Sequence, residues 1–381
     1  MQRDRSACAE HRARAVAWLA ARVPFLSNFV PDPERPKPFE SSVYREVPWA
    51  RQYWKEESER RVSYASYVGW REVPFSGQTV NVGADQRRRT PDSGDCGGSV
   101  KTIWMFGGST MLGTGSPDWE TIPSNLARLL ETSGAPACVV NFGQTGWRNS
   151  QELIELLQEL KRNARRPDLV VFYDGYNDGY AFYQSGKIDV HMNYDIVRKQ
   201  LERASERRIG SLLLEAFTRS NTGQLLTGAA RRQTTIFGYA SADSRPPNEA
   251  DAKLDLEIRY LRNLDVVRAL AEQYRFRYAF FWQPVIFAGH KQLTAEEERI
   301  RRFFSTGIYE ADAQYRQMAT LLRSGTIPHL FDLSDVFDAK QETVYIDYVH
   351  VGPEGNRLIA LRMRDVLKHA GLLSAPAAKS P

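Results

Sequence analysis

The chain has 381 residues, 42% of them hydrophobic, and its 51 basic and 46 acidic side chains give a formal net charge of +5. This length and apolar content are enough for a large buried core and exclude overall disorder. The one run of three basic residues, Arg87 to Arg89, is too short for the dense basic stripe that nucleic acid requires. We expect a globular protein with no nucleic-acid partner, and the mild positive charge is compatible with an anionic substrate.

The three cysteines, Cys8, Cys96 and Cys138, are odd in number and widely separated. This pattern favours neither a disulfide framework nor a C-x-x-C metal site, and Cys138 lies in an apolar run typical of a buried strand. Few and scattered cysteines favour the reducing cytoplasm. No spacing among the histidines indicates a metal, and no motif indicates a cofactor.

Residues 1–98 are predicted to form an N-terminal appendage that packs on the main domain. An apolar stretch from Ala15 to Ala21 follows several arginines, but it is far too short to span a bilayer and is at the lower limit for a signal sequence. A short amphipathic helix, resting on the protein or on a membrane surface, fits better, and export stays open as a weaker alternative. Residues 78–90, around Gly83, predict a small pair of strands.

From residue 99 to 375 the pattern becomes regular. Short continuous apolar runs at 101–106, 137–142, 168–173, 277–282 and 329–333 alternate with helical stretches. Such runs are typical of strands buried on both faces of a parallel sheet. We therefore predict an α/β fold, a three-layer α/β/α sandwich with a mostly parallel, flavodoxin-like sheet. Residues 181–255 exceed what a crossover needs and are predicted to be an insertion that forms a lid or substrate wall.

Four short polar segments, called strings here, lie at positions in the sequence that can bring them to one edge of the predicted sheet. Ligands of open parallel sheets bind beyond the carboxyl ends of the strands. The first three predicted strands end in "GGS", "NFGQTGW" and "DGYNDGY", and a late loop reads "DYVHVGPEG". These strings carry a hydroxyl, glycine backbone amides, a side-chain amide and an Asp-x-x-His pair, which are the groups that acyl-transfer chemistry uses.

The segment "WMFGGSTMLG", which contains the first string, does not match the sequence patterns of three common functional loops. A P-loop would need a lysine where Thr114 stands, and a dinucleotide fingerprint lacks its third glycine. The G-x-S-x-G elbow of α/β-hydrolases fails because Met111 occupies its last position. Taken alone, this string also permits a flavodoxin-like anion-binding loop.

Together the four strings resemble the SGNH hydrolases, also called GDSL-like esterases and lipases. That family has a serine after the first strand, N-x-x-x-x-G after the second, G-x-N-D after the third and D-x-x-H near the C-terminus. The resemblance covers about residues 100 to 370 and departs at Gly108, where the family usually has aspartate. The matching residues here are Ser109, Asn141 to Gly146, Gly175, Asn177, Asp178, Asp347 and His350.

The resemblance implies a catalytic triad and an oxyanion hole. Ser109 would be the nucleophile, and His350, oriented by Asp347, would take its proton and return it to the leaving alcohol. The backbone N–H groups of Ser109 and Gly146 and the side-chain amide of Asn177 would bind the oxyanion.

The resemblance also indicates an activity. It implies a serine esterase that hydrolyses a small acyl group, such as acetyl, from a carbohydrate or secondary metabolite through an acyl-enzyme on Ser109. Two alternatives stay open: an O-acyltransferase with the same acyl-enzyme, and a non-catalytic ligand-binding protein of the same fold. Trp147 and Tyr176, which adjoin the predicted oxyanion donors, are the candidates for contact with a small-molecule or glycan ester. The sequence does not indicate an oligomeric state.

Overall fold

The computed structural model describes residues 36–97, 100–162, 166–205, 249–325 and 327–373. The chain divides into two compact units, one of residues 36–194 and 240–381 and the other of residues 1–35 and 195–239. Of the second unit, the structure describes the part of helix α8 (Tyr194–Ser205) in which Arg198 pairs with Asp195 and Glu202. The predicted N-terminal helix, Cys8 and residues 206–248 of the predicted insertion lie outside the described residues.

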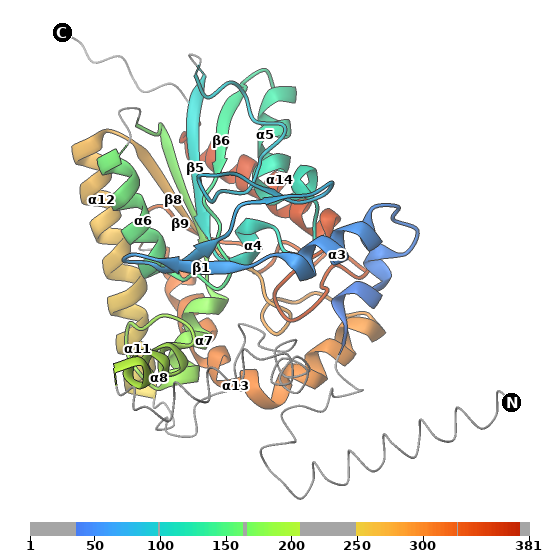
Figure 1. The fold of residues 1–381 in the computed structure, drawn as a ribbon, viewed down its shortest axis with the longest axis vertical. Helices are drawn as coiled ribbons and strands as arrows, with labels where there is room; N and C mark the ends of the chain where they lie inside the picture. The colour runs from blue at the N-terminus through green and yellow to red at the C-terminus, as the bar shows by residue number, and fades with distance from the viewer. Residues whose placement is uncertain (1–35, 98–99, 163–165, 206–248, 326, 374–381) are drawn as a thin grey trace, which may run out of the picture. The chain divides into compact units, whose positions relative to one another are not determined.

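A five-stranded parallel sheet forms the centre of the first unit (Figure 1). Its order is β6-β5-β7-β8-β9, so the first strand lies between the second and the third, as in flavodoxin-like folds. The predicted sheet is therefore confirmed, strand by strand. The strands are β5 (Lys101–Gly107), β6 (Ala137–Asn141), β7 (Leu169–Asp174), β8 (Arg277–Trp282) and β9 (Leu330–Asp332).

A row of phenylalanines crosses the sheet and fills the core on one side. Phe106 stacks on Phe142 and Phe172 with ring centroids 4.5 and 5.3 Å apart, and Phe172 stacks on Phe280 at 4.5 Å. All four are buried. In β5, β7 and β8 the residues that point to the opposite face are buried as well, which explains why these strands have continuous apolar sequences rather than alternating ones.

Helices cover both faces of the sheet (Figure 1). The helices α5 (Ile122–Thr132) and α14 (Pro353–His369) pack together on one face, and α6 (Asn149–Arg162) and α12 (Arg262–Tyr274) on the other. This confirms the three-layer prediction. The remaining helices of the domain are α4 (Ser109–Leu112), η3 (Asp118–Glu120), α7 (Tyr176–Ser185), α11 (Glu249–Leu256), η4 (Glu257–Leu261) and α13 (Ala295–Ser324).

Residues 36–97 form an N-terminal segment, whose first part crosses the carboxyl edge of the sheet (blue in Figure 1). The strand pair predicted at 78–90 forms differently, because β4 pairs with β3 and only an isolated bridge joins Val82 to Arg88. The elements of the segment are η1 (Pro38–Glu40), η2 (Ser42–Tyr44), α3 (Ala50–Glu59), β1 (Val62–Ala65), β2 (Gly69–Glu72), β3 (Phe75–Ser76) and β4 (Asn81–Val82).

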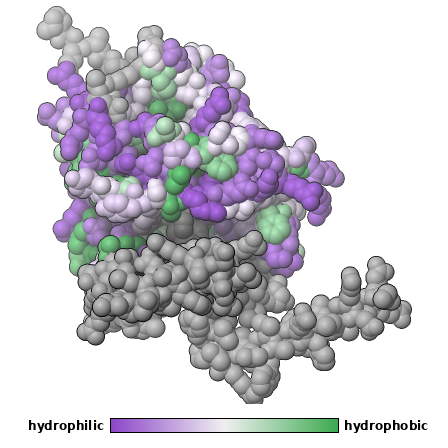
Figure 2. All heavy atoms as spheres, in the orientation of Figure 1, coloured by the Kyte–Doolittle hydropathy of each residue, from purple (hydrophilic) through white to green (hydrophobic). Residues whose placement is uncertain are grey.

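The visible described surface is largely hydrophilic, with hydrophobic residues in small groups (Figure 2). The most exposed large apolar side chains are Tyr64 and Tyr67, in and next to β1. Among the described residues, no helix combines the length and the apolar content needed to cross a membrane.

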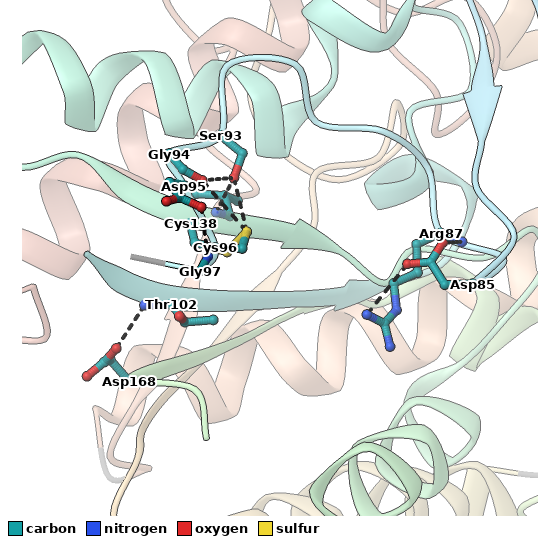
Figure 3. Close-up of a disulfide and its surroundings, with 11 residues drawn as sticks. Asp85, Arg87, Ser93, Gly94, Asp95, Cys96, Gly97, Thr102, Cys138 and Asp168 are labelled. Atoms are coloured by element: carbon teal, nitrogen blue, oxygen red, sulfur yellow. Dashed lines mark hydrogen bonds and ion pairs between the residues drawn. A yellow bond between two sulfur atoms is a disulfide. The ribbon is translucent and has the colours of Figure 1, made fainter. Parts of the chain in front are cut away.

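A disulfide joins Cys96 to Cys138, so the expectation that these cysteines stay unpaired is wrong (Figure 3). The residues before Cys96 run beside β6: Gly94 N–H donates to Ala137 O at 2.9 Å, and Val139 N–H donates to Ser93 Oγ at 2.8 Å. The spacing of the cysteines in the sequence does not reveal this contact, because tertiary packing brings a distant loop to the edge strand. Since disulfides persist mainly in oxidising compartments, the cysteine pattern no longer supports a reducing one.

We expect this disulfide to stabilise the fold by about 3 kcal/mol, because it closes a loop between residues 42 positions apart. Thermal unfolding with and without dithiothreitol measures the effect. The melting temperature of the wild type should fall in the reductant, and that of the double variant Cys96→Ala/Cys138→Ala should not change. Equal melting temperatures for the wild type in both buffers would contradict the prediction.

Candidate active site

The first and last of the four strings meet at the carboxyl edge of the sheet. Ser109 begins α4 directly after β5, and Asp347 and His350 lie in the loop before α14. His350 Nε2 lies 2.7 Å from Ser109 Oγ, and His350 Nδ1 lies 2.7 Å from Asp347 Oδ2. The carboxylate sets the tautomer, since Nδ1–H donates to it and Nε2 is then free to accept the serine proton. Ser109 and His350 are both only 3% exposed.

The Asp347 carboxylate orders its own loop. Its second oxygen, Oδ1, accepts the N–H of Val349 at 2.9 Å and that of His350 at 2.7 Å. Burial opposes the charge of the carboxylate, but His350 and these backbone donors outweigh it, and the pKa of Asp347 is lowered. Burial likewise opposes a charged imidazole, but the charges of Asp347 and Glu57 outweigh it, and the pKa of His350 is raised.

A buried glutamate on α13 holds the start of this loop. Glu297 Oε1 accepts the N–H of Val344 at 3.0 Å and that of Tyr345 at 3.2 Å, and its other oxygen pairs with Lys291 at 2.7 Å. Sequence reasoning missed this role. The capping box that Thr294 and Glu297 form can signal the start of a helix, but not which distant backbone groups the glutamate reaches.

The glycine before the nucleophile is explained by its contact with Asn177. A Cβ atom at Gly108 would lie 2.3 Å from Asn177 Nδ2 and 3.1 Å from the carbonyl oxygen of Trp147. Any side chain at position 108 would therefore displace the amide, which donates to Trp147 O at 2.7 Å. In this structure, position 108 therefore has no room for a side chain unless Asn177 moves.

The predicted oxyanion donors come from three neighbouring turns. Gly146 has φ +69°, a left-handed conformation that favours glycine, and Asn177 stands in the first turn of α7. Within the described residues, no backbone or side-chain acceptor takes up the N–H of Ser109 or Gly146. Asn177 donates one amide hydrogen to the carbonyl of Trp147, which leaves its second amide hydrogen available to a ligand. Their role as an oxyanion hole stays a prediction.

A buried ion cluster lies next to these turns in the sequence. Asp178, directly after Asn177, is 2.8 Å from Arg259, which also pairs with Asp255 at 2.9 Å. Arg148, directly after Trp147, lies 3.8 Å from both carboxylates. Burial and the nearby Arg259 lower the pKa of Arg148 to about 10. The cluster ties the residue after the second string, Arg148, to Asp178 of the third string.

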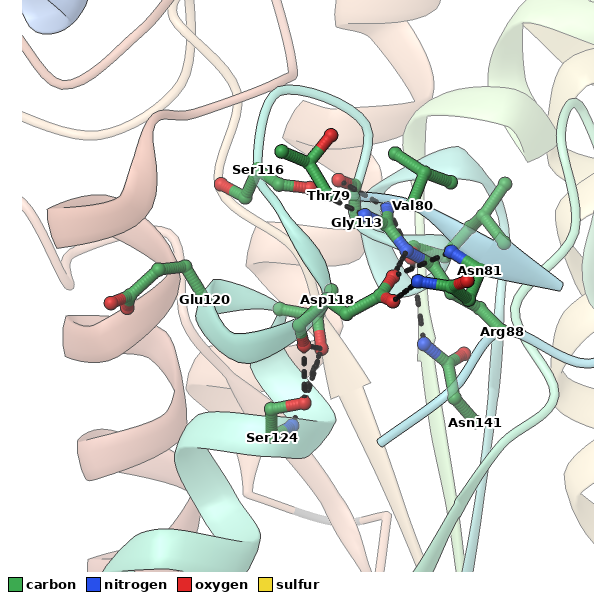
Figure 4. A network of polar contacts seen from close by, with 12 residues as sticks. Thr79, Val80, Asn81, Arg88, Gly113, Ser116, Asp118, Glu120, Ser124 and Asn141 are labelled. Atoms are coloured by element: carbon green, nitrogen blue, oxygen red, sulfur yellow. Dashed lines mark hydrogen bonds and ion pairs between the residues drawn. The ribbon is translucent and has the colours of Figure 1, made fainter. Parts of the chain in front are cut away.

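The N-terminal segment supplies another buried charge, Arg88, which fixes the end of α4 (Figure 4). Its guanidinium donates to the carbonyls of Leu112, Gly113 and Ser116 at 3.1, 2.8 and 2.6 Å, and it pairs with Asp118 at 2.9 Å. Carbonyls at a helix end lack partners within the helix, and Arg88 satisfies them while leaving none of its own side chain exposed. In the sequence Arg88 was only one of three consecutive arginines.

Asn141 supports the same turn from the second string. Its side-chain amide donates to Met111 O at 3.2 Å, and its side-chain oxygen accepts the N–H of Gly143 at 2.8 Å. A Cβ atom at Gly143 would lie 2.2 Å from Leu112 N, so the two turns are in direct backbone contact. These contacts link the second string to the turn that carries Ser109.

The two aromatic residues predicted to touch substrate are buried. Trp147 donates its indole N–H to Trp70 O at 2.8 Å, and Tyr176 packs against Tyr348 with ring centroids 4.5 Å apart. Each residue is 1% exposed. Their present contacts are therefore with protein, and contact with a substrate stays a prediction.

No protein-family model matches the sequence, and no curated protein matches it. Similar solved structures include a member of the lipolytic protein G-D-S-L family from Veillonella parvula, with 11% identity, 71% of this chain and 99% of that chain covered, and a TM-score of 0.37. The acetyl xylan esterase AlAXEase has 13% identity, coverage of 70% and 99%, and a TM-score of 0.33. AlinE4, an SGNH-hydrolase family esterase, has 14% identity, coverage of 74% and 99%, and a TM-score of 0.30. At these sequence identities and TM-scores the similarities say nothing about individual residues. The roles of residues are therefore inferred from the contacts within this chain.

Replacing Arg88 by methionine should lower the free energy of unfolding by about 3–5 kcal/mol, because it leaves Asp118 buried without its partner. Arg89→Met is the matched control, since Arg89 is exposed, and it should stay within about 0.5 kcal/mol of the wild type. Urea denaturation measures both variants. If Arg88→Met lowered the free energy of unfolding by less than about 1 kcal/mol, the contacts of Arg88 would not stabilise the turn after α4.

The pKa of His350 should exceed about 6.5, and Asp347→Asn should lower it. Burial lowers the pKa of the imidazole, and the substitution removes the carboxylate charge that opposes this effect. NMR titration of the histidine ring resonances measures these values. The exposed His290, which contacts Asp338 rather than Asp347, provides the internal reference signal. An unchanged His350 pKa in the variant would mean that Asp347 does not stabilise the imidazolium.

Proposed function

We propose that this chain is a serine esterase of the SGNH hydrolase type, which releases a small acyl group, such as acetyl, from a carbohydrate or another small alcohol. The observation that carries the proposal is the unbroken chain of contacts from Ser109 Oγ through His350 to Asp347, each 2.7 Å long. A hydroxyl is a weak nucleophile by itself, and an adjacent base whose ring is held by a carboxylate is the arrangement that activates it.

The first half of the reaction acylates the serine. Ser109 Oγ attacks the carbonyl carbon of the ester, and its proton passes to His350 Nε2. The carbonyl oxygen becomes an oxyanion, for which the N–H groups of Ser109 and Gly146 and the amide of Asn177 are the available donors. When the bond to the alcohol oxygen breaks, the alcohol leaves with the proton from His350 and the acyl group remains on Ser109.

The second half regenerates the enzyme by the same groups. Water gives a proton to His350 and attacks the acyl carbon, and the bond to Ser109 Oγ breaks as the oxygen recovers that proton. A carboxylic acid is released. The raised pKa of His350 suits this cycle, because the imidazolium must persist long enough to protonate two successive leaving oxygens.

Hydrolysis of p-nitrophenyl acetate should require Ser109, and Ser109→Ala should lower kcat by at least about 1000-fold, since the nucleophile is removed. A fluorophosphonate probe should label the wild type at Ser109 and should not label this variant. Thr110→Ala is the matched control, because Thr110 is the next hydroxyl in α4 and contacts Gln283 rather than His350. Equal hydrolysis by wild type and Ser109→Ala, or no hydrolysis and no labelling, would refute the esterase.

A further inference from the structure

We infer that Glu57, on α3 of the N-terminal segment, binds the substrate of the proposed esterase by accepting a hydrogen bond from a hydroxyl on the alcohol portion of the ester. The inference rests on the proposed function and names its substrate class, which is esters of uncharged, polyhydroxylated alcohols. It also assigns a role in recognition to a segment that lies outside the four strings.

One side of Glu57 is fixed to the loop that follows the nucleophile. Tyr53 donates its hydroxyl to Glu57 Oε2 at 3.0 Å, and the same hydroxyl accepts the N–H of Gly115 at 2.7 Å. The carbonyl oxygen of Gly115 also accepts a hydrogen bond from the Tyr44 hydroxyl at 2.6 Å. A single tyrosine hydroxyl therefore separates Glu57 from the loop that leaves α4.

The other side of Glu57 is fixed to the turn that holds a predicted oxyanion donor. Arg60 pairs with Glu57 Oε2 at 2.8 Å and donates to Thr145 Oγ1 at 3.2 Å. Thr145 directly precedes Gly146, and its hydroxyl also donates to Glu72 at 2.6 Å. Glu57 and Arg60 therefore link the loop after α4, which contains Gly115, to the turn that contains Gly146.

The geometry leaves Glu57 one free acceptor. Oε2 accepts from both Tyr53 and Arg60, and no donor among the described residues reaches Oε1. The side chain is 17% exposed, so a ligand can reach it. The charge of Glu57 adds to that of Asp347 in raising the pKa of His350 against the effect of burial. A charged acceptor that Tyr53 and Arg60 hold next to the loop after α4 and the turn before Gly146 is placed to bind a hydroxyl.

The charges at this end of the sheet disfavour an anionic alcohol. Among the described residues, the carboxylates of Glu57 and Glu72 share the guanidinium of Arg60, and that of Asp347 contacts His350. The charge of Arg88, which also acts on Tyr53, is paired with Asp118. Burial raises the pKa of both Tyr44 and Tyr53, so neither tyrosine adds a charge. The local charge is therefore negative, although the whole chain carries +5. A neutral hydroxyl can approach Glu57, whereas a second carboxylate would be repelled.

The wild-type enzyme provides the first test, through kcat/KM for two esters with the same acyl group. These are methyl glucopyranoside and methyl glucopyranosiduronate, each bearing one O-acetyl group at the same position. We expect about a tenfold preference for the neutral sugar. Equal or reversed preference, or turnover of p-nitrophenyl acetate with none of the neutral sugar ester, would overturn the substrate class while leaving the esterase in place.

The second test compares Glu57→Gln with Glu59→Gln, an exposed position on the same helix. In Glu57→Gln the ratio of kcat/KM for the neutral sugar ester to that for p-nitrophenyl acetate should fall about tenfold. The acid limb of its pH profile should also move to lower pH, because one negative charge near His350 is lost. Glu59→Gln should match the wild type in both respects.

The outcomes separate this inference from the proposed function. If Glu57→Gln keeps the wild-type ratio and pH profile, Glu57 does not bind the substrate, although Ser109 can still be the nucleophile. If Glu57→Gln does not fold, the preference of the wild-type enzyme for the neutral sugar decides alone. If the wild type hydrolyses none of the esters, the proposed function fails first, and this inference with it.

Discussion

The parallel sheet is the constraint on which the rest of this structure depends. Because all five strands run in one direction, each strand that ends in a polar string delivers it to the same edge. The central place of β5 then matters most, since its neighbours are β6 and β7, which carry the second and third strings. Three segments separated in sequence thus become adjacent through backbone hydrogen bonds alone, before any side chain of the site is considered.

Adjacent turns at this edge are held by polar groups rather than by apolar packing. The end of α4 has carbonyls without helical partners, and buried Arg88 satisfies them at 2.6 to 3.1 Å. Glu297 does the same for the N–H groups at the start of the late loop. A buried charge is costly unless it is paired, and each of these has an ion-pair partner, Asp118 for Arg88 and Lys291 for Glu297. Their remaining hydrogen bonds go to backbone groups of the turn after Ser109 and of the loop before α14.

The N-terminal segment contacts the turns of the candidate site directly. It contributes Arg88 to the turn after Ser109, and Tyr53 to Gly115. The hairpin of β1 and β2 is fixed to the second string, since Trp70 donates to Thr145 O at 2.7 Å and accepts from Trp147 at 2.8 Å. These contacts join the segment to the turns that hold Ser109 and Gly146, and the proposed role of Glu57 in recognition depends on them.

The sequence by itself determined the five strands, the alternation with helices and the identity of the four strings, since continuous apolar runs and polar turn residues are local signals. It also singled out Ser109, Asp347 and His350, whose mutual contacts the structure then shows. Only the tertiary structure decided that Cys96 pairs with Cys138, that Gly108 is required by Asn177, and that Arg88 and Glu297 hold the site. Each of these joins groups far apart in the chain, and a long-range contact between two side chains leaves no periodicity at either position.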